Sequence, residues 1–419
     1  MKLNYGKTFL LGFGFFGVSV IWGVYNAFVP LFLANKFDLA PAWIGFFMTL
    51  DNIAALLIQP PIGVWSDKMR SPLGRRMPFI LIGAPIGALA FGIIPIAAVL
   101  PLFVACTSTL LLSMAFWRTP VVALMPDITP SKFRSQANGI INFMGGVGAI
   151  ISFLGGSALY KLNPNFPFWM GSGLVIISIL LLFIFIKVPK VYEDVEKQPG
   201  MLASLKIVMQ DPDKSALRIL SAIFFWFIGY TAIEAFFSLY ANKHLGLEEA
   251  DGARLLGQLS LIFVIFALPA GYIGAKIGRK VTISLGLLIM MACTSAMYFI
   301  PPGLLTLELT KLPVLGIVPV VGVILMFAGA GWALININSL PMVVDMTTET
   351  RIGTYTGLYY LFSTLSAIVG PNMNGWIIQL SNLNYNAIMI VSPILMLVAL
   401  ILMLGVHKGE AKTETISVN

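Results

Sequence analysis

The chain has 419 residues, of which 58% are hydrophobic and 11% are charged, with 26 Lys and Arg against 18 Asp and Glu. A typical soluble domain carries about 25% charged residues. This composition excludes a soluble enzyme, a disordered protein and a nucleic-acid-binding protein, although the net charge is +8. The excess of basic residues instead indicates an integral membrane protein, because Lys and Arg collect on the cytoplasmic side of a bilayer.

Cysteine and histidine are scarce, which excludes further classes of protein. Cys106 and Cys293 both lie in apolar runs, and His244 and His407 lie near the ends of hydrophobic segments. This pattern predicts no disulfide framework, no metal site and no cofactor. It also offers no cluster for enzymatic catalysis, and no Gly-Lys-Ser/Thr phosphate-binding loop for ATP-driven work.

Twelve segments have the length and apolar character of membrane spans, for which about 20 mostly apolar residues are needed. The first resembles a signal peptide because Lys2 and Lys7 precede it, but it continues to about Leu33 without a convincing cleavage site. In chain order the predicted spans are 8–34, 42–66, 77–99, 101–126, 133–160, 166–188, 216–241, 252–275, 281–300, 313–344, 352–380 and 385–406.

One polar stretch divides the spans six and six. We predict an N-terminal six-helix bundle over residues 1–188, a cytoplasmic linker over 189–214, a C-terminal six-helix bundle over 215–408 and a cytoplasmic tail over 409–419. With both termini inside, 20 of the 26 basic residues are cytoplasmic and five lie outside. This bias predicts a multi-pass protein of the cell membrane with both termini in the cytoplasm.

The two halves of the chain repeat each other. Residues 26–32 align with residues 234–240 at an offset of 208, and Ala-Asn-Lys follows each segment. Gly74-Arg75-Arg76 aligns with Gly278-Arg279-Lys280 at an offset of 204, and Asp127 aligns with Asp345 at 218. Two parallel six-span repeats are a plan of secondary transporters, whose substrate site lies at the repeat interface near the membrane midplane.

The loop between the second and third spans runs from Gly63 through Asp67-Lys68 to Gly74-Arg75-Arg76. It resembles the signature loop of the major facilitator superfamily, with a four-residue insertion, and residues 271–280 resemble its degenerate second copy, in which Ala275 replaces the acid. The resemblance implies an all-α fold of twelve transmembrane helices in two pseudo-repeated bundles. It also implies ionic gates, for which we predict Gly63, Asp67, Arg75, Arg76, Asp127, Arg134, Asp345 and Arg351. The alternative is a positive loop that only sets topology.

A closer resemblance covers some twenty residues, from Gln59-Pro60-Pro61 to Met77-Pro78-Phe79-Ile80. It is similar to the sucrose-transporter branch of the superfamily, which is akin to the glycoside–cation symporters. Where melibiose-type carriers place acids around an Asp-Pro, this chain has Gln59-Pro60, which favours protons over sodium. Plant sucrose transporters have an Arg where this chain has Val122, and here the Arg is one turn earlier, at Arg118.

Three charged residues fall deep within spans: Asp51, Arg118 and Glu234. A charge at the bilayer centre costs at least ~2.5 kcal/mol, so such residues are candidates for function. At 1.5 Å per residue, Asp51 and Glu234 are expected at similar depth, roughly 24 and 27 Å from the cytoplasmic ends of their spans. We predict that Asp51 or Glu234 carries a coupling proton and that Arg118 binds substrate or competes for the carboxylate. The alternative is that all three are satisfied structural groups.

A sugar site combines planar polar groups for hydroxyls with aromatic faces for the ring. Each candidate has the alternative role of helix packing. The predicted substrate-binding residues are Tyr25, Asn26, Trp117, Arg118, Asn138, Asn142, Tyr230, Trp332, Asn336, Asn338, Tyr355 and Tyr359. The run Asn372-Met373-Asn374 after Pro371 is a candidate helix break.

The sequence therefore predicts a secondary transporter, not an enzyme, that moves a disaccharide or glucoside by alternating access with proton symport. Its expected partners are the sugar and the lipid bilayer, and it is expected to function as a monomer. A facilitator or exporter of another small polar or amphipathic solute is the alternative in the same class. An integral-membrane enzyme or receptor is the alternative from a different class, although a receptor would not explain the repeated halves.

Overall fold

The computed structural model describes residues 4–129, 133–187, 201–347 and 351–410, and the side chains of 134–136, 201–204 and 207 lie outside that description. The first half contains α1 (Tyr5–Leu31), the π-helix η1 (Phe32–Lys36), α2 (Pro41–Phe47), α3 (Leu50–Lys68), α4 (Met77–Ile93), η2 (Ile94–Ile96), α5 (Leu100–Ile128), α6 (Arg134–Ile150), the π-helix η4 (Ile151–Gly155), α7 (Gly156–Leu162) and α8 (Phe166–Phe185). The second half contains α9 (Met201–Gln210), α10 (Ser215–Leu239), the π-helix η5 (Tyr240–His244), α11 (Glu249–Ile277), α12 (Arg279–Phe299), α13 (Pro302–Leu305), β1 (Glu308–Leu312), β2 (Gly316–Pro319), α14 (Val320–Val344), α15 (Ile352–Leu380) and α16 (Ala387–Leu404).

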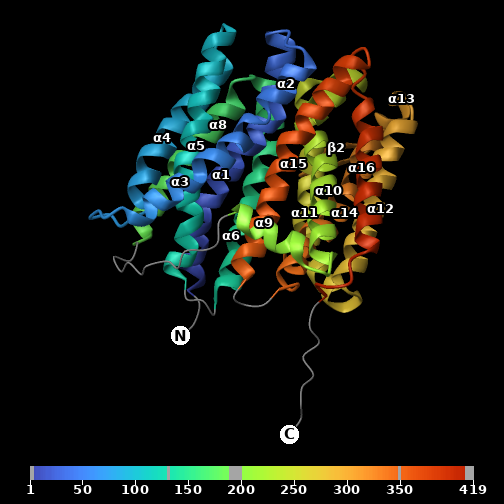
Figure 1. Cartoon of the computed structure of the whole chain (residues 1–419). Coiled ribbons are helices and arrows are strands. Elements are labelled where there is room, and N and C mark those ends of the chain that lie inside the picture. The colour runs from blue at the N-terminus through green and yellow to red at the C-terminus, as the bar shows by residue number, and fades with distance from the viewer. Residues whose placement is uncertain (1–3, 130–132, 188–200, 348–350, 411–419) are drawn as a thin grey trace.

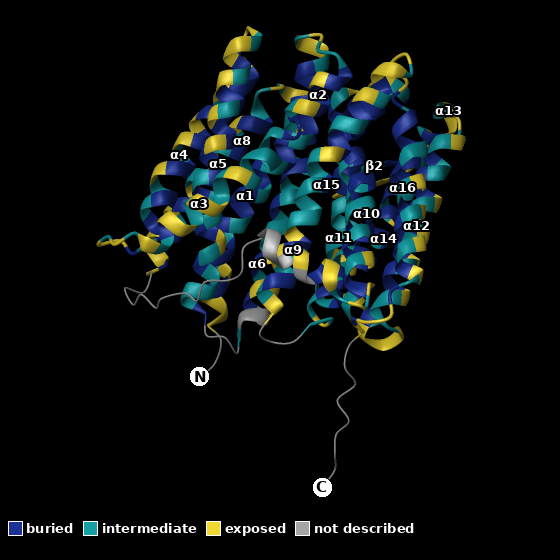
Figure 2. Ribbon diagram, viewed as in Figure 1, coloured by how far each residue is buried: buried dark blue, intermediate teal, exposed yellow. Residues whose placement is uncertain are grey.

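Each of the twelve predicted spans corresponds to a long helical segment. Within the described ranges, eleven segments are long and apolar enough to cross a membrane. The twelfth is α15, which has 29 residues but is less apolar because it carries many Thr, Ser, Tyr and Asn residues. Large apolar side chains such as Ile82, Leu89 and Ile184 are exposed on the outer helices (Figure 2), as contact with lipid tails requires.

The helices form two groups that stand side by side (Figure 1). In the first half α1 packs on α6 and α8, and in the second half α10 packs on α15 and α16. The start of α1 and the end of α16 lie at the same end of the molecule. We call this end, which carries Arg75 and Arg279, the basic end, and the opposite end, which carries Asn35 and Glu249, the far end.

The second predicted span is broken in the structure. Helix α2 ends at Phe47 and α3 begins at Leu50, and the Thr49 hydroxyl donates to the Phe46 carbonyl at 2.7 Å. The break places Asp51 in the first turn of α3, where the helix dipole favours a negative charge. Sequence periodicity gave no sign of this break, because the residues on both sides are equally apolar.

Two other expectations about spans need correction. Helix α15 continues through Pro371, and the Asn372 and Asn374 amides donate to carbonyls one turn earlier, at 2.8 and 2.9 Å, so the candidate helix break is absent. The tenth span begins at Val320 instead of 313, because residues 308–319 form an antiparallel hairpin. Gly316, the first residue of β2, has φ of +67°, a conformation that glycine adopts without steric cost.

Candidate functional site

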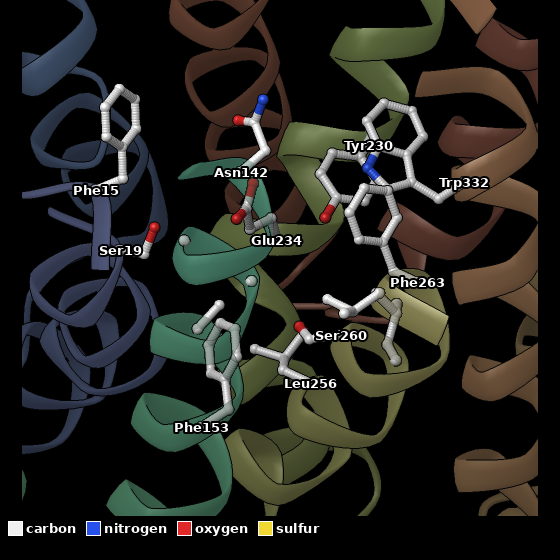
Figure 3. A pocket seen from close by; sticks show the side chains of 15 residues that line it. Phe15, Ser19, Asn142, Phe153, Tyr230, Glu234, Leu256, Ser260, Phe263 and Trp332 are labelled. Carbon is white, nitrogen blue, oxygen red and sulfur yellow. The ribbon is translucent and has the colours of Figure 1, made fainter. Parts of the chain in front are cut away.

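A cavity of about 290 Å³ lies between the two halves, close to the middle of the bundle. Its size is at the lower limit for small-molecule sites. Helices α1 and α6 with η4 line one side of it, and α10, α11 and α14 line the other (Figure 3). The lining residues are Phe15, Ser19, Asn142, Gly145, Gly146, Ala149, Phe153, Tyr230, Glu234, Leu256, Leu259, Ser260, Phe263, Val264 and Trp332.

The carboxylate of Glu234 is the acid that lines this cavity. The Asn26 side chain on α1 donates a hydrogen bond to Glu234 Oε1 on α10, over 3.4 Å. These residues are equivalents in the two repeats, 208 positions apart, so the contact joins matching points of the halves across their pseudo-symmetry axis. Asn35 and Asn242, also equivalents, contact each other at 3.5 Å nearer the far end. The repeat alignment predicted these matches, although not that the paired residues touch.

An aromatic wall stands beside Glu234. The Tyr230 and Trp332 rings stack in parallel, with centroids 3.8 Å apart and an interplanar angle of 4°. Tyr230 precedes Glu234 by four residues on α10, so both side chains lie on one face of that helix. Phe227 packs edge-on against Trp332 from behind at 5.3 Å. The cavity therefore presents a flat aromatic surface next to a carboxylate (Figure 3).

Asp51 and Arg118 do not line the cavity, but they belong to the same electrostatic group. Asp51 interacts electrostatically with Arg118 and with Glu234, and Asn52 donates to Asp51 Oδ1 at 2.8 Å. Arg118 also interacts with Tyr360 of the second half. No ion pair within 4.0 Å joins Asp51 to Arg118, both of which are described residues, so their interaction is longer-range.

The remaining predicted substrate residues divide into three groups. Tyr25 and Trp117 are buried inside the first half, and Tyr25 lies near Asp51. Asn138 is exposed on α6, one turn before the cavity residue Asn142. The third group lies within the second half and outside the cavity lining. The Asn336 backbone carbonyl accepts a hydrogen bond from Ser339, whose hydroxyl also bonds with that of Tyr359. The Asn338 amide donates to the Ala270 and Leu334 carbonyls, and Tyr355 is buried.

The predicted gate residues of the first half come together at the basic end. The Arg75 guanidinium forms a bidentate ion pair with the Asp127 carboxylate, with N···O distances of 2.5 and 3.0 Å. Arg76 is buried, pairs with both Asp67 and Asp127, and donates to the Ser66 hydroxyl at 2.5 Å. Gly63 does not need to be glycine for packing in this state, because a Cβ there would meet only Thr119, at 3.5 Å.

The second half repeats part of this ionic network. Arg279 pairs with Asp345, as its equivalent Arg75 pairs with Asp127, and it also donates to the Pro341 carbonyl at 3.0 Å. Arg351 is exposed at the start of α15. The side chain of Arg134 lies outside the described residues.

Hydrogen bonds and ion pairs join the two halves at the far end. Glu249 of α11 accepts hydrogen bonds from Asn35 and Tyr160 of the first half, both at 2.5 Å. Lys161 forms ion pairs with Glu248 at 3.0 Å and Asp251 at 2.9 Å, and it lowers the pKa of the Glu248 carboxyl. Across residues 4–129, 133–187, 201–347 and 351–410, every hydrogen bond and ion pair found between the halves lies at the centre or the far end. The structure therefore represents a state closed at the far end.

Sequence reasoning missed several of these residues. Ser19 and Ser260 line the cavity, but a serine in a span carries no distinctive signal. Tyr160, Lys161 and Glu249 lie near predicted span ends, where charges are ordinary. Their role depends on the approach of α7 to α11, which pairs segments far apart in the chain.

Two repeated halves, a central cavity between them and ionic networks at the helix ends are the features of a membrane transporter. The Major Facilitator Superfamily profile matches residues 11–371 and also 260–417. The chain therefore belongs to the major facilitator superfamily.

Similar proteins carry several different substrates in their names. The chain is 26% identical over 174 residues to sucrose transport protein SUC3 of Arabidopsis thaliana, covering 36% of this chain and 29% of the plant protein. It is 25% identical over 281 residues to multidrug resistance protein 2 of Bacillus subtilis, covering 65% of this chain and 67% of the relative. It is 26% identical over 288 residues to the putative nucleoside transporter YegT of Escherichia coli, covering 67% and 65%.

Solved structures agree on the fold. The nucleoside transporter NupG superposes with a TM-score of 0.73 at 15% identity, covering 96% of this chain and 100% of NupG. A bacterial homologue of the human lysosomal transporter Spinster, in an inward-facing and occupied conformation, gives 0.69 at 16% identity, covering 97% and 95%. These similar structures show the fold but do not determine the class of substrate, which has to be argued from the residues that line the cavity.

Proposed function

We propose that this protein is a proton-coupled symporter of the cell membrane that moves a disaccharide or glucoside by alternating access. The observation that carries the proposal is the Glu234 carboxylate, which lies in the central cavity, bonded to Asn26 of the other half and flanked by the Tyr230–Trp332 stack. An acid at a desolvated membrane site gains and loses protons near neutral pH more readily than one in water.

The coupling follows from the position of that carboxylate. When Glu234 is ionised, the Asn26 amide donates to it and links the halves at the cavity. Protonation removes the negative charge and weakens this charge-assisted bond, so the halves can move once a substrate contacts both walls. Asp51 interacts electrostatically with Glu234 and is the second candidate acid, because repulsion between two carboxylates favours the protonated form of one of them.

The sugar would bind between the two walls. Its hydroxyls would contact Glu234, Asn142 and the serine hydroxyls, while the apolar face of its ring would lie on Tyr230. In this reading the protein acts as a monomer with both termini in the cytoplasm, which makes the basic end the inner one. The positive bias at that end supports this orientation.

The apolar lining also favours a second candidate. Phe15, Phe153 and Phe263 line the same cavity as the carboxylate, and a flat aromatic wall suits a planar ring as well as a sugar. A nucleoside or an amphipathic organic solute would use the same surfaces, and relatives named for nucleoside and multidrug transport support keeping this alternative.

Uptake into proteoliposomes tests both proposals. Labelled sucrose, maltose, an aryl glucoside, a nucleoside and a lipophilic cation are offered with and without an inward proton gradient. We expect gradient-driven uptake of one or more of the sugars, which Glu234→Gln abolishes. Transport of only the nucleoside or the cation would refute the sugar proposal, and uptake indifferent to the gradient would refute proton coupling.

A further inference from the structure

Helix α2 belongs to the first half by sequence but packs mainly on α15 of the second half. The Ala42 amide donates to Gln379 Oε1 at 3.3 Å, and a Cβ on Gly45 would run into the Pro371 carbonyl oxygen. On the other side, the break at residues 48–49 separates α2 from α3 and so from the rest of its own half. Helix α2 is therefore a short lid at the far end, held by the second half.

The break is built on Thr49, a fully buried residue that touches both halves. Its backbone amide and its hydroxyl both donate to the Phe46 carbonyl, at 3.0 and 2.7 Å. In a continuous helix that carbonyl would bind the Leu50 amide, four residues ahead. The Thr49 hydroxyl also accepts from the Asn372 side chain of α15 at 3.0 Å. The form of the break is thus tied to the second half by a hydrogen bond.

Asp51 binds backbone amides at the start of α3, which have no partner within the helix. Its carboxylate accepts from its own backbone amide, from the backbone amide of Asn52 and from the Asn52 side chain, the last at 2.8 Å. Such bonds are stronger when the carboxylate is ionised, and the helix dipole favours a negative charge at a helix start. The ionised form of Asp51 therefore stabilises the break.

Other helices surround Asp51 with charged and titratable groups. Arg118 of α5, Tyr25 of α1 and Glu234 of α10 interact with it electrostatically. Helix α15, which also packs on α3, carries Tyr360, which interacts with Arg118. Arg118 attracts the negative charge of Asp51, and an ionised Glu234 repels it. The bonds to the α3 amides are what connects that charge to the shape of the helix.

We propose that the break between α2 and α3 is a proton-sensitive hinge, which ionised Asp51 stabilises and which protonation of Asp51 releases. When Asp51 is neutral, its bonds to the α3 amides weaken, and the Phe46 carbonyl can bind the Leu50 amide as in a continuous helix. Helix α2 then changes direction and leaves α15, because the close backbone contact at Gly45 cannot follow it. Proton binding thus favours the state that is open at the far end, and closure favours release of the proton.

The hinge gives Asp51 a role that differs from that of the central carboxylate, and it makes Thr49 and Asn372 positioning residues. Its use in transport rests on the proposed proton coupling, but its movement needs no substrate. A conformational measurement therefore tests the hinge, while the uptake experiment tests the coupling, and either can fail alone.

Pulsed electron paramagnetic resonance measures the hinge in the full-length chain without substrate. Spin labels replace Val99 and Leu380, exposed residues at the far end of the first and the second half, in a chain whose buried Cys106 and Cys293 are changed to Ala. The pH is lowered from about 8 to about 5, a range in which desolvated acids titrate. We expect the far-end-open population to rise about threefold to tenfold, as the loss of one capping interaction implies.

Two variants assign this response to one acid. Asp51→Asn should be as open at neutral pH as the parent is at acid pH, and should respond to pH no further. Asp38→Asn removes another acid of the first half, in the loop before α2, and is the matched control. Asp38 is exposed and has φ of +50°, which asparagine tolerates, so this variant should respond as the parent does.

Two variants of Thr49 separate the hinge from an effect of charge alone. Thr49→Val keeps the shape of the side chain but removes the hydroxyl, and should raise the far-end-open population at neutral pH about threefold to tenfold. Thr49→Ser keeps the hydroxyl and should stay within about twofold of the parent. The proposal is overturned if the parent does not open at acid pH, if Asp51→Asn keeps the parent's response, or if the two Thr49 variants have equal populations.

Discussion

The closed far end depends on two glycines that allow backbone to pack on backbone between the halves. A Cβ on Gly375 of α15 would lie 2.5 Å from the Pro41 carbonyl oxygen and 3.1 Å from Ala42 Cα of the other half. A Cβ on Gly45 of α2 would likewise run into the Pro371 carbonyl oxygen. The atoms in the way are backbone, so no side-chain rotation can relieve the overlap, and the helices must move apart.

Gly375→Ala and Gly45→Ala should therefore destabilise the state that is closed at the far end. Overpacking a tight contact costs about 1–3 kcal/mol. Since the clash exists only where α2 meets α15, that cost enters the equilibrium between states and corresponds to about a 5- to 150-fold shift toward the far-end-open state. Transport should slow because the protein closes its far end less often.

Pulsed electron paramagnetic resonance measures this shift as a distance across the far end. Spin labels at Leu162 and Leu309, which are exposed residues of the two halves, should show a longer distance in both glycine variants. Gly173→Ala on α8 is the matched control, because a Cβ there would meet nothing within 4 Å. Distances in Gly375→Ala and Gly45→Ala that are the same as in the Gly173→Ala control would refute the steric argument.

Three further changes test the centre and both ends. Glu234→Gln should abolish uptake driven by a proton gradient but keep exchange of substrate across the membrane at equal pH. If gradient-driven uptake is retained, Glu234 is not the proton-coupling acid, and Asp51 becomes the candidate. Asp127→Asn should reduce the initial transport rate more than Asp345→Asn, because Asp127 holds two arginines and Asp345 pairs with one; the reverse order would count against the ionic gate. Lys161→Met should raise far-end opening at most about fivefold, because the Lys161 side chain is 41% exposed and such exposed pairs contribute about 0.2–1 kcal/mol. Spin-label distances unchanged from the parent would show that the ion pairs of Lys161 are dispensable.

The parts of this molecule that sequence predicted are those that depend on hydropathy and repetition. The number of spans follows from the length of apolar runs, and the internal repeat predicted that Asn26 and Glu234 hold equivalent positions. The parts it missed depend on backbone geometry and distant contacts. The break before Asp51 is made by local hydrogen bonding at Thr49, and the hydrogen bond from Tyr160 to Glu249 joins residues that are 89 positions apart.

Residues of the candidate site show the same division. Tyr230, Glu234, Trp332 and Asn142 were predicted from residue type and depth, and the structure places all four around one cavity. Trp117 and Asn338 have equally suitable chemistry, but they point into the packed interior of their own halves. Hydropathy alone cannot tell these groups apart, because a span has no polar face to show which side meets a cavity.

The repeat also explains why one carboxylate, not two, faces the cavity. Helices α1 and α10 pack on each other, so equivalent residues meet in pairs, as Asn35 and Asn242 do. Two acids at such a meeting point would repel each other and would share a single proton. The chain instead pairs an amide on α1 with an acid on α10, and the amide can donate to the ionised acid. The departure from symmetry at this one pair is therefore what gives the interface a group that can respond to protonation.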